Sequence, residues 1–113
     1  MIQIFGRAKC KDTRAAQRFF SERRVAVQFV DLAERALSRG ELESVARAVG
    51  LRRLHDVERD PTVRYAPLSE TKLTELLLAQ PKLLRTPIVR EGPRAACGAD
   101  PAAWQAFVDA RSG

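Results

Sequence analysis

Hydrophobic and polar positions in the first 30 residues predict a strand, a helix and a second strand. Residues 2–5 form a short apolar run that ends at Gly6, which is typical of a buried strand. Over residues 12–24 the apolar positions recur at helical spacing, and charged residues fill much of the remainder. Residues 25–30 are β-branched and aromatic, which favours a second strand.

The middle of the chain predicts two helices separated by a loop. Ser38 and Glu41 have the spacing of a capping box, and we expect a helix over about 38–49. Residues 51–68 contain arginines and two prolines without a sustained period, so we expect mostly loop with one helical turn. Ser69 can cap another helix that runs to about residue 79.

The last third predicts a β-hairpin followed by a helix. Residues 87–90 and 94–97 are the predicted strands, and the sequence Asp100-Pro101 is typical of a helix start. A strand–helix–strand opening implies a parallel pair, to which the hairpin adds antiparallel strands. We therefore expect one α/β domain over residues 1–113, with a thioredoxin-like mixed sheet and a helical insertion over about 38–80.

The amino-acid composition narrows the classes of binding partner but does not identify one. Lysine and arginine total 20 against 14 acidic residues, giving a net charge of +6, and sixteen of the 20 are arginine. Guanidinium groups bind oxyanions and acidic surfaces, but codon bias explains such an excess equally well. No predicted helix concentrates basic residues, which argues against a nucleic-acid partner. No segment approaches the ~20 apolar residues of a membrane span and no signal peptide is evident, so we expect a cytoplasmic protein without membrane association.

Cys10 is the best candidate nucleophile. It lies between the first strand and the first helix, beside Lys9 and Lys11. A helix start and adjacent cations lower the pKa of a free cysteine from ~8.5 to about 3.5–7.5. Arg14, four residues on, lies on the same helix face and can reach the sulfur or a bound oxyanion. The alternative is an inert cysteine beside a solvated arginine.

Several segments together resemble the arsenate reductase (ArsC) and Spx-like family of the thioredoxin-like superfamily. They are Cys10 with Arg14, the helix from Ser38 to Gly50, Gln80-Pro81-Lys82-Leu83-Leu84, Thr86-Pro87-Ile88-Val89 and Gly92-Pro93-Arg94. The resemblance implies that Cys10 is nucleophilic, that Pro87 follows a cis bond beside it, and that Arg94 helps to bind an oxyanion.

The chain departs from this family at its arginines. The family usually has arginine directly before the cis proline, where this chain has Thr86. The nearest arginine is Arg85, and a one-residue step in an extended segment turns its side chain to the other face. A further family arginine falls in the loop, where Arg64 is our first choice and Arg59 our second. The predicted substrate-binding residues are therefore Arg94, Arg64, Arg59, Arg85, Thr86 and Pro87.

The sequence indicates neither a resolving cysteine next to Cys10 nor a metal site. Thr13 occupies the place of the second cysteine in a Cys-x-x-Cys motif, so the resolving thiol would be external, or Cys97. Cys97 is more typical of a small buried hydrophobic residue. His55 is the one histidine in the sequence, so we expect no metal centre.

Two functions follow from the resemblance. The first is a thiol-dependent reductase in which Cys10 attacks an arsenate-like oxyanion or a disulfide, with glutathione or glutaredoxin as the reductant and no bound cofactor. The alternative is a non-enzymatic, Spx-like regulatory module that binds a protein partner such as RNA polymerase.

Overall fold

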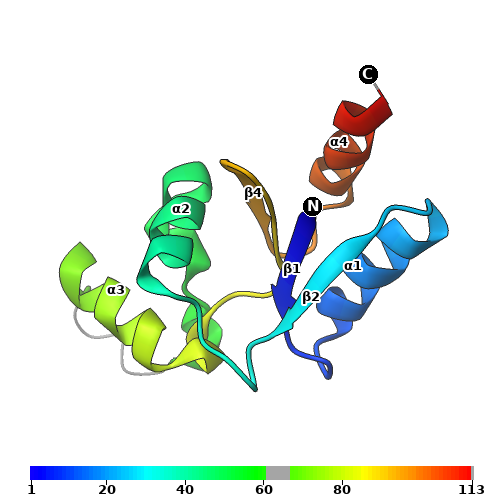
Figure 1. Cartoon of the computed structure of the whole chain (residues 1–113). Helices are drawn as coiled ribbons and strands as arrows, with labels where there is room; N and C mark the ends of the chain where they lie inside the picture. Colours follow the sequence, from blue (N-terminus) through cyan, green and yellow to red (C-terminus); the bar gives the residue numbers. More distant parts are fainter. Residues whose placement is uncertain (61–66, 113) are drawn as a thin grey trace.

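Four strands form one mixed sheet that lies between the helices (Figure 1). The structure is a computed structural model that describes residues 1–60 and 67–112. The strands are β1 (Ile2–Gly6), β2 (Val27–Asp31), β3 (Ile88–Glu91) and β4 (Arg94–Cys97), in the spatial order β2-β1-β3-β4. β1 pairs in parallel with β2 and antiparallel with β3, and β3 pairs antiparallel with β4. The predicted parallel opening and C-terminal hairpin are confirmed.

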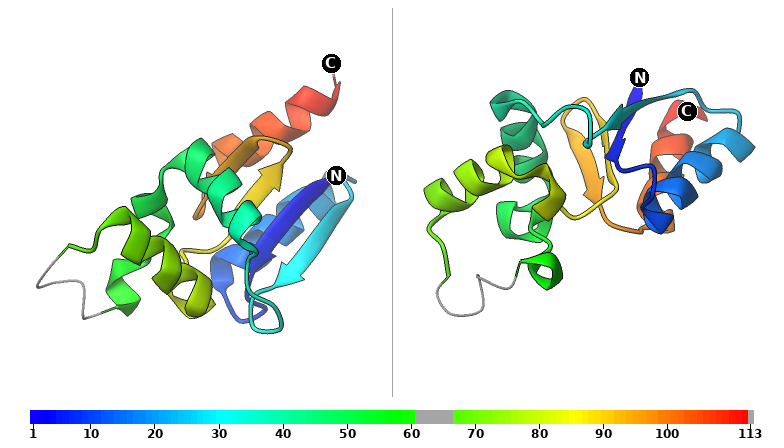
Figure 2. Two further views of the ribbon diagram at one scale, coloured as in Figure 1. Left: turned by 60° about the vertical axis from the view of Figure 1, so that its left-hand side comes forward. Right: turned by 90° about the horizontal axis from the view of Figure 1, so that it is seen from below.

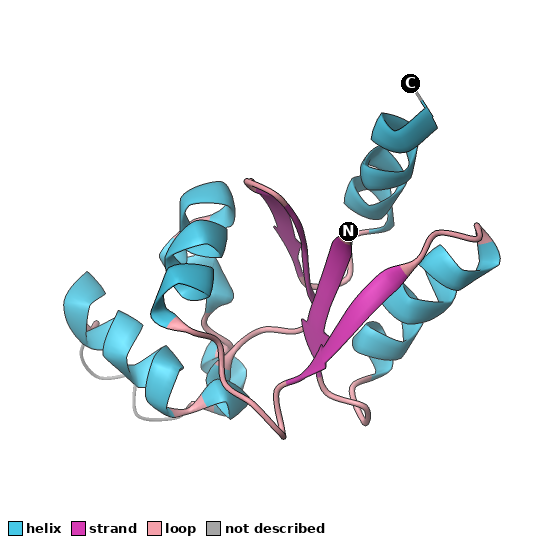
Figure 3. Ribbon diagram, viewed as in Figure 1, coloured by secondary structure: helices cyan, strands magenta, loops and turns pink. Residues whose placement is uncertain are grey.

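Helices cover both faces of this sheet (Figures 2 and 3). The helices α1 (Lys11–Glu22) and α4 (Pro101–Ser112) lie on one face, and α2 (Arg39–Val49) and α3 (Glu70–Ala79) lie on the other. In the described ranges, no helix is both long enough and apolar enough to cross a bilayer.

The alternation of side chains along β1 divides the buried residues into two clusters. Ile2 and Ile4 pack with Phe20 of α1 and Trp104 of α4. Phe5 belongs to the other cluster, which also holds buried leucines of α2 and α3. Since successive side chains of a strand point to opposite faces, β1 contributes to both clusters.

The strand predicted over 25–30 begins and ends later than expected. Arg24 has a φ of 58°, and the N–H of Val25 donates to the carbonyl of Phe20 over 3.0 Å. The N–H of Val25 is therefore used at the end of the helix and does not pair with a neighbouring strand. At the other end, Asp31 pairs with Gly6, which extends β2 by one residue.

The segment predicted to be mostly loop contains two short 3₁₀ helices among its described residues. They span Leu51–Leu54 and Val57–Arg59, and a third such turn covers Pro81–Leu83. His55, between the first two, forms an antiparallel bridge with Leu84. Residues 61–66, with the candidate Arg64, lie outside the described residues.

Candidate functional site

Cys10 lies at the start of α1, close to the end of β1. It is the N-cap residue of the helix, with an extended backbone. Its N–H donates to the carbonyl of Arg7 over 2.9 Å, and its carbonyl accepts from the N–H of Arg14 over 3.0 Å. The turn formed by residues 7–10 thus leaves the sulfur beside the free N–H groups of the first helical turn.

A hydrogen bond from Thr86, together with donor groups of Thr13 and the first turn of α1 nearby, favours the thiolate form of Cys10. The Thr86 hydroxyl donates to the Cys10 sulfur over 3.2 Å. Burial by itself raises the pKa of Cys10, but it is outweighed by the hydroxyl groups of Thr13 and Thr86 and the backbone N–H groups of Thr13 and Asp12, which can donate to the thiolate. The pKa is therefore lowered from the ordinary thiol value. Because the thiolate is the nucleophilic form, these donors increase the reactivity of Cys10 at neutral pH.

Thr13 packs against the end of β1 because Gly6, the last residue of that strand, has no side chain. Thr13 is fully buried, and its hydroxyl oxygen has no partner among the hydrogen bonds of the described residues in the resting structure. A Cβ atom at Gly6 would lie 2.4 Å from that oxygen. The absence of a side chain at Gly6 therefore lets Thr13 pack against the strand and remain available to donate to a thiolate.

Arg7 also lines the site, although it was not among the site residues predicted from the sequence. It donates to the Thr86 hydroxyl over 3.1 Å, and so continues the hydrogen-bond chain that ends at the Cys10 sulfur. It also donates to the carbonyls of Pro81 and Leu84, over 3.4 and 3.5 Å. Burial, followed by the charge of a nearby arginine, lowers the pKa of Arg7. The sequence feature that could have identified Arg7 as a site residue is its position directly after the first strand and three residues before Cys10.

The Cys10 sulfur opens into a cavity of about 260 Å³ whose charges are mixed. Its lining residues are Arg7, Cys10, Asp12, Asp56, Glu58, Arg59, Arg85, Thr86, Gly98 and Ala99. Three arginines and three acidic side chains therefore surround one thiol. Asp56 and Arg59 form an ion pair of 3.4 Å, which neutralises part of this charge.

The predicted site residues divide into those that line this cavity and those that do not. Arg59, Arg85 and Thr86 line it, and the Thr86–Pro87 bond is cis, as the resemblance implied. The described lining includes neither Arg14 nor Arg94. The exposed Arg94 guanidinium pairs with Glu91 over 3.0 Å and lies over the ring of Phe107, while Arg14 is exposed on α1.

A buried histidine–aspartate pair closes the loop that supplies one wall of the cavity. His55 Nε2 and Asp60 Oδ2 are 3.0 Å apart, and the two residues are 3% and 5% exposed. The lining residues Asp56, Glu58 and Arg59 all lie between them in the sequence. The pair thus joins the two ends of the loop and holds it in place, and neither residue is in the described lining of the cavity. In the described part of the chain, no group of three or more His, Cys, Asp or Glu side chains could hold a metal ion.

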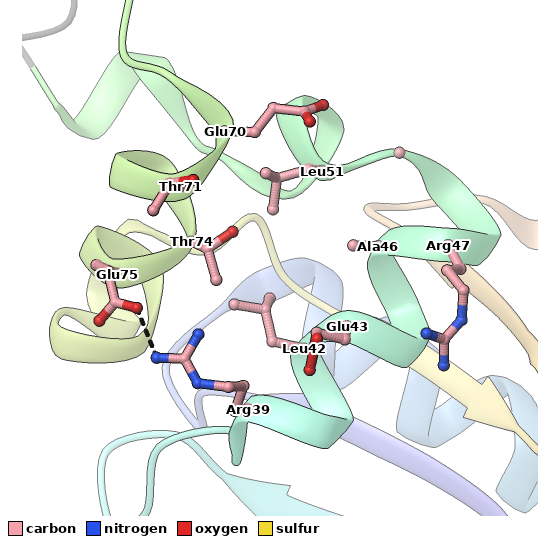
Figure 4. Close-up of a pocket in the computed structure, with 11 residues that line it drawn as sticks. Arg39, Leu42, Glu43, Ala46, Arg47, Leu51, Glu70, Thr71, Thr74 and Glu75 are labelled. Carbon is pink, nitrogen blue, oxygen red and sulfur yellow. Dashed lines mark hydrogen bonds and ion pairs between the residues drawn. The ribbon is translucent and has the colours of Figure 1, made fainter.

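A cavity larger than the one at Cys10 lies between α2 and α3 (Figure 4), and Cys10 is not among its lining residues. It encloses about 550 Å³, and the ion pair between Arg39 and Glu75 joins the two helices beside it. No thiol or imidazole is present in its described lining. We therefore place the candidate active site at Cys10 because of the chemistry of its side chains, not because of the volume of its cavity.

Comparison with known proteins confirms the fold. A model of the ArsC family matches residues 5–107. Among solved structures, the protein YffB is 25% identical with a TM-score of 0.84, and the match covers 94% of this chain and 97% of that one. Arsenate reductase from Vibrio cholerae is 21% identical with a TM-score of 0.80, covering 93% and 95% of the two chains.

A third solved structure, an arsenate reductase (ArsC) related protein from Brucella melitensis, is 21% identical with a TM-score of 0.69, covering 95% and 93%. No curated protein matches the sequence. The predicted thioredoxin-like α/β fold is confirmed by these similarities and by the order of the strands.

Proposed function

The chain belongs to the ArsC family, and from this membership and the setting of Cys10 we propose that it is a thiol-dependent reductase in a reducing cytoplasm. The observation that carries the proposal is the Cys10 sulfur at the start of α1, 3.2 Å from the Thr86 hydroxyl. Hydrogen bonds favour the thiolate there, and a cavity gives a substrate access to it.

In the proposed reaction a disulfide is the principal substrate. The Cys10 thiolate attacks one sulfur of the disulfide, a Cys10 mixed disulfide forms, and the other sulfur leaves as a thiolate. A glutathione thiolate then attacks the mixed disulfide and releases Cys10. A second glutathione completes the exchange, so that one disulfide is reduced to two thiols and two glutathione molecules are oxidised to one disulfide.

The resolving thiol in this scheme is external. Thr13 lies where a neighbouring second thiol would stand in a Cys-x-x-Cys motif, and burial raises the pKa of Cys97 to about 11. Cys97 is therefore protonated at neutral pH and a poor nucleophile. Glutathione, or a glutaredoxin that uses glutathione, would supply the missing thiol.

An arsenate-like oxyanion is the second candidate substrate, and three arginines in the cavity favour it. Cys10 would displace one oxygen of arsenate as water and form a sulfur–arsenic bond. Glutathione would then attack the Cys10 sulfur, which breaks the sulfur–arsenic bond, releases arsenite and leaves a Cys10–glutathione disulfide that a second glutathione reduces. Arsenic would thereby be reduced from the +5 to the +3 state. The acidic side chains of Asp12, Asp56 and Glu58 in the same cavity oppose the binding of a doubly charged anion, so we rank this substrate below the disulfide.

A coupled assay with matched cysteine variants tests the proposal. The protein is assayed with hydroxyethyl disulfide and glutathione, and separately with arsenate, glutathione and glutaredoxin. We expect Cys10→Ala to reduce turnover to the uncatalysed background and Cys97→Ala to retain it. Turnover that survives in Cys10→Ala would overturn the assignment. Absence of turnover with both substrates would instead favour the Spx-like interaction module.

A further inference from the structure

A second cavity adjoins the Cys10 cavity. It encloses about 340 Å³ and is lined by Arg53, Arg85, Cys97, Gly98 and Ala99. Three of these residues, Arg85, Gly98 and Ala99, also line the Cys10 cavity. A small molecule that reacts at Cys10 can therefore extend an arm into the second cavity.

The charges of the second cavity differ from those around Cys10. It has two guanidinium groups, those of Arg53 and Arg85, and its described lining includes no acidic side chain. Burial keeps the Cys97 thiol neutral by raising its pKa to about 11; Arg85 and Arg53 act in the opposite direction, and the nearby Asp56 adds to the rise. Both charged side chains of the described lining are thus cationic, which favours an anionic group, while Asp56 lies outside this lining.

The Arg85 side chain is anchored by the backbone, not by a carboxylate. Its Nε donates to the carbonyl of Arg53 over 3.2 Å, and one Nη donates to the carbonyl of His55 over 3.5 Å. A Cβ at Gly98, where φ is 80°, would lie 3.5 Å from Arg85 Cδ. The stem of Arg85 therefore lies close to the chain, and in the described part of the protein neither Arg85 nor Arg53 forms an ion pair.

We propose that this cavity, with Arg53 and Arg85 as its cationic groups, is a subsite for a carboxylate carried by the small disulfide or thiol that reacts at Cys10. The proposal rests on the proposed reductase function. Forked guanidinium donors bind a carboxylate through paired hydrogen bonds, and thiols built from amino acids carry such groups. The acidic side chains near Cys10 would direct the carboxylate away from the thiol and into this cavity.

The arrangement assigns separate roles to the two cavities during exchange. While the carboxylate is bound by the two arginines, the disulfide bond lies at the Cys10 sulfur. The thiolate attacks the nearer sulfur, and the departing half takes a proton from solvent. Binding at the subsite increases the local concentration of the disulfide without taking part in bond making.

A pair of disulfides of similar size tests the subsite. We would measure the rate of Cys10 mixed-disulfide formation by mass spectrometry for dithiodipropionate, which carries two carboxylates, and for the neutral hydroxyethyl disulfide. Arg53→Gln and Arg85→Gln should each slow the reaction of the charged disulfide about three- to tenfold. The rate with the neutral disulfide should stay within about twofold, and Arg85→Lys should recover part of the loss.

Arg18→Gln is the matched control, because it removes the same charge from an exposed position on α1. It should leave both rates unchanged. An equal loss for both disulfides in the Arg53 and Arg85 variants would overturn the subsite, since the arginines would then act on Cys10 and not on the carboxylate. An unchanged rate for dithiodipropionate would overturn it as well.

A binding measurement separates failure of the subsite from failure of the reductase function. Glutarate, a redox-inert dicarboxylate, is titrated into Cys10→Ala while the amide resonances of Gly98 and Ala99 are followed by NMR. We expect saturable shifts that disappear on further substitution Arg53→Gln, and no shifts with neutral glutaramide. Absence of saturable shifts would overturn the subsite. Saturable binding beside a Cys10 that reacts with neither disulfide would overturn the reductase function alone.

Discussion

At the scale of single residues, the Cys10 sulfur is stabilised by hydroxyl and backbone donors. Thr86 lies directly before the cis proline, where the resemblance implied an arginine, and its hydroxyl donates to the sulfur while accepting from Arg7. A positive charge therefore acts on the thiol through one intermediate hydroxyl. Thr86 thus links the Arg7 guanidinium to the Cys10 sulfur.

Replacing Thr86 tests this account. Thr86→Val keeps the shape of the side chain and removes the donor, so the pKa of Cys10 should rise. The rate of Cys10 alkylation by iodoacetamide at pH 7 should fall about three- to tenfold. Thr71→Val, at an exposed position of α3, serves as the control. An unchanged dependence of the rate on pH would show that the Thr86 bond does not favour the thiolate.

Gly6 supports the same sulfur indirectly, through Thr13. In Gly6→Ala the added Cβ would meet the Thr13 hydroxyl at 2.4 Å, so Thr13 must move. We expect a loss of about 1–3 kcal/mol in the free energy of unfolding, together with a raised pKa of Cys10. Gly40→Ala is the control, since no atom lies within 4 Å of its Cβ and alanine favours the helix. If both variants unfolded alike, the close packing of Gly6 and Thr13 would be refuted.

At the scale of elements, the start of α2 shows how local sequence positions a helix. Ser38 accepts from the N–H of Glu41, and the Glu41 carboxylate accepts from the N–H of Ser38, which completes the predicted capping box. Arg35 adds two hydrogen bonds to the same carboxylate, of 2.8 and 3.0 Å. The bonds from Arg35, and then those from Ser38, lower the pKa of Glu41 to about 2.

This lowered pKa predicts how stability depends on pH. The unfolded carboxyl has its ordinary value of 4.5, so the ionised Glu41 stabilises the folded state fully above pH 4.5. That contribution is lost as the pH falls from 4.5 towards 2. In urea unfolding, the stability difference between the wild type and Glu41→Gln should therefore shrink over this interval. Glu43→Gln, on an exposed position of the same helix, should show a flatter difference. A difference for Glu41→Gln that does not depend on pH would contradict the interpretation.

At the scale of the whole molecule, β1 joins two apolar clusters that lie on opposite faces of the sheet. Trp104 and Phe20 belong to one cluster, and Leu73 belongs to the other. Since β1 contributes side chains to both, loss of either cluster should remove support from the strand that precedes Cys10. We therefore expect the described parts of the chain to unfold together.

Leu73→Ala tests this cooperativity. The substitution removes a buried side chain of α3 and should cost about 2–5 kcal/mol. The unfolding midpoint followed by Trp104 fluorescence should shift as much as the midpoint followed by circular dichroism. Lys72→Ala, at an exposed neighbouring position, should change stability by less than about 0.5 kcal/mol. A fluorescence midpoint that does not move would indicate two independently unfolding halves.

The arginine excess has several separate structural roles at this scale. Arg35, Arg39, Arg94 and Arg111 form ion pairs with glutamates on the surface. Arg7, Arg59 and Arg85 line the cavity at Cys10, and Arg53 lines the cavity beside it. The net charge of +6 is thus spread over several local environments. It does not by itself indicate a nucleic-acid partner.

The sequence alone determined the order of the elements, the helix caps at Ser38 and Ser69, and the position of Cys10 between a strand and a helix. These features depend on residues within a few positions of one another, so periodicity and capping patterns reveal them.

Only the tertiary structure decided which arginines meet at the thiol. Arg7 and Thr86 are 79 residues apart in sequence and 3.1 Å apart in space, whereas Arg14, four residues from Cys10, does not line the described cavity. Each strand and turn can be predicted locally, but how segments far apart in the chain come together depends on strand pairing and on packing across both faces of the sheet. That packing brings Arg7, Arg85 and the loop carrying Arg59 to the one cavity that Cys10 lines.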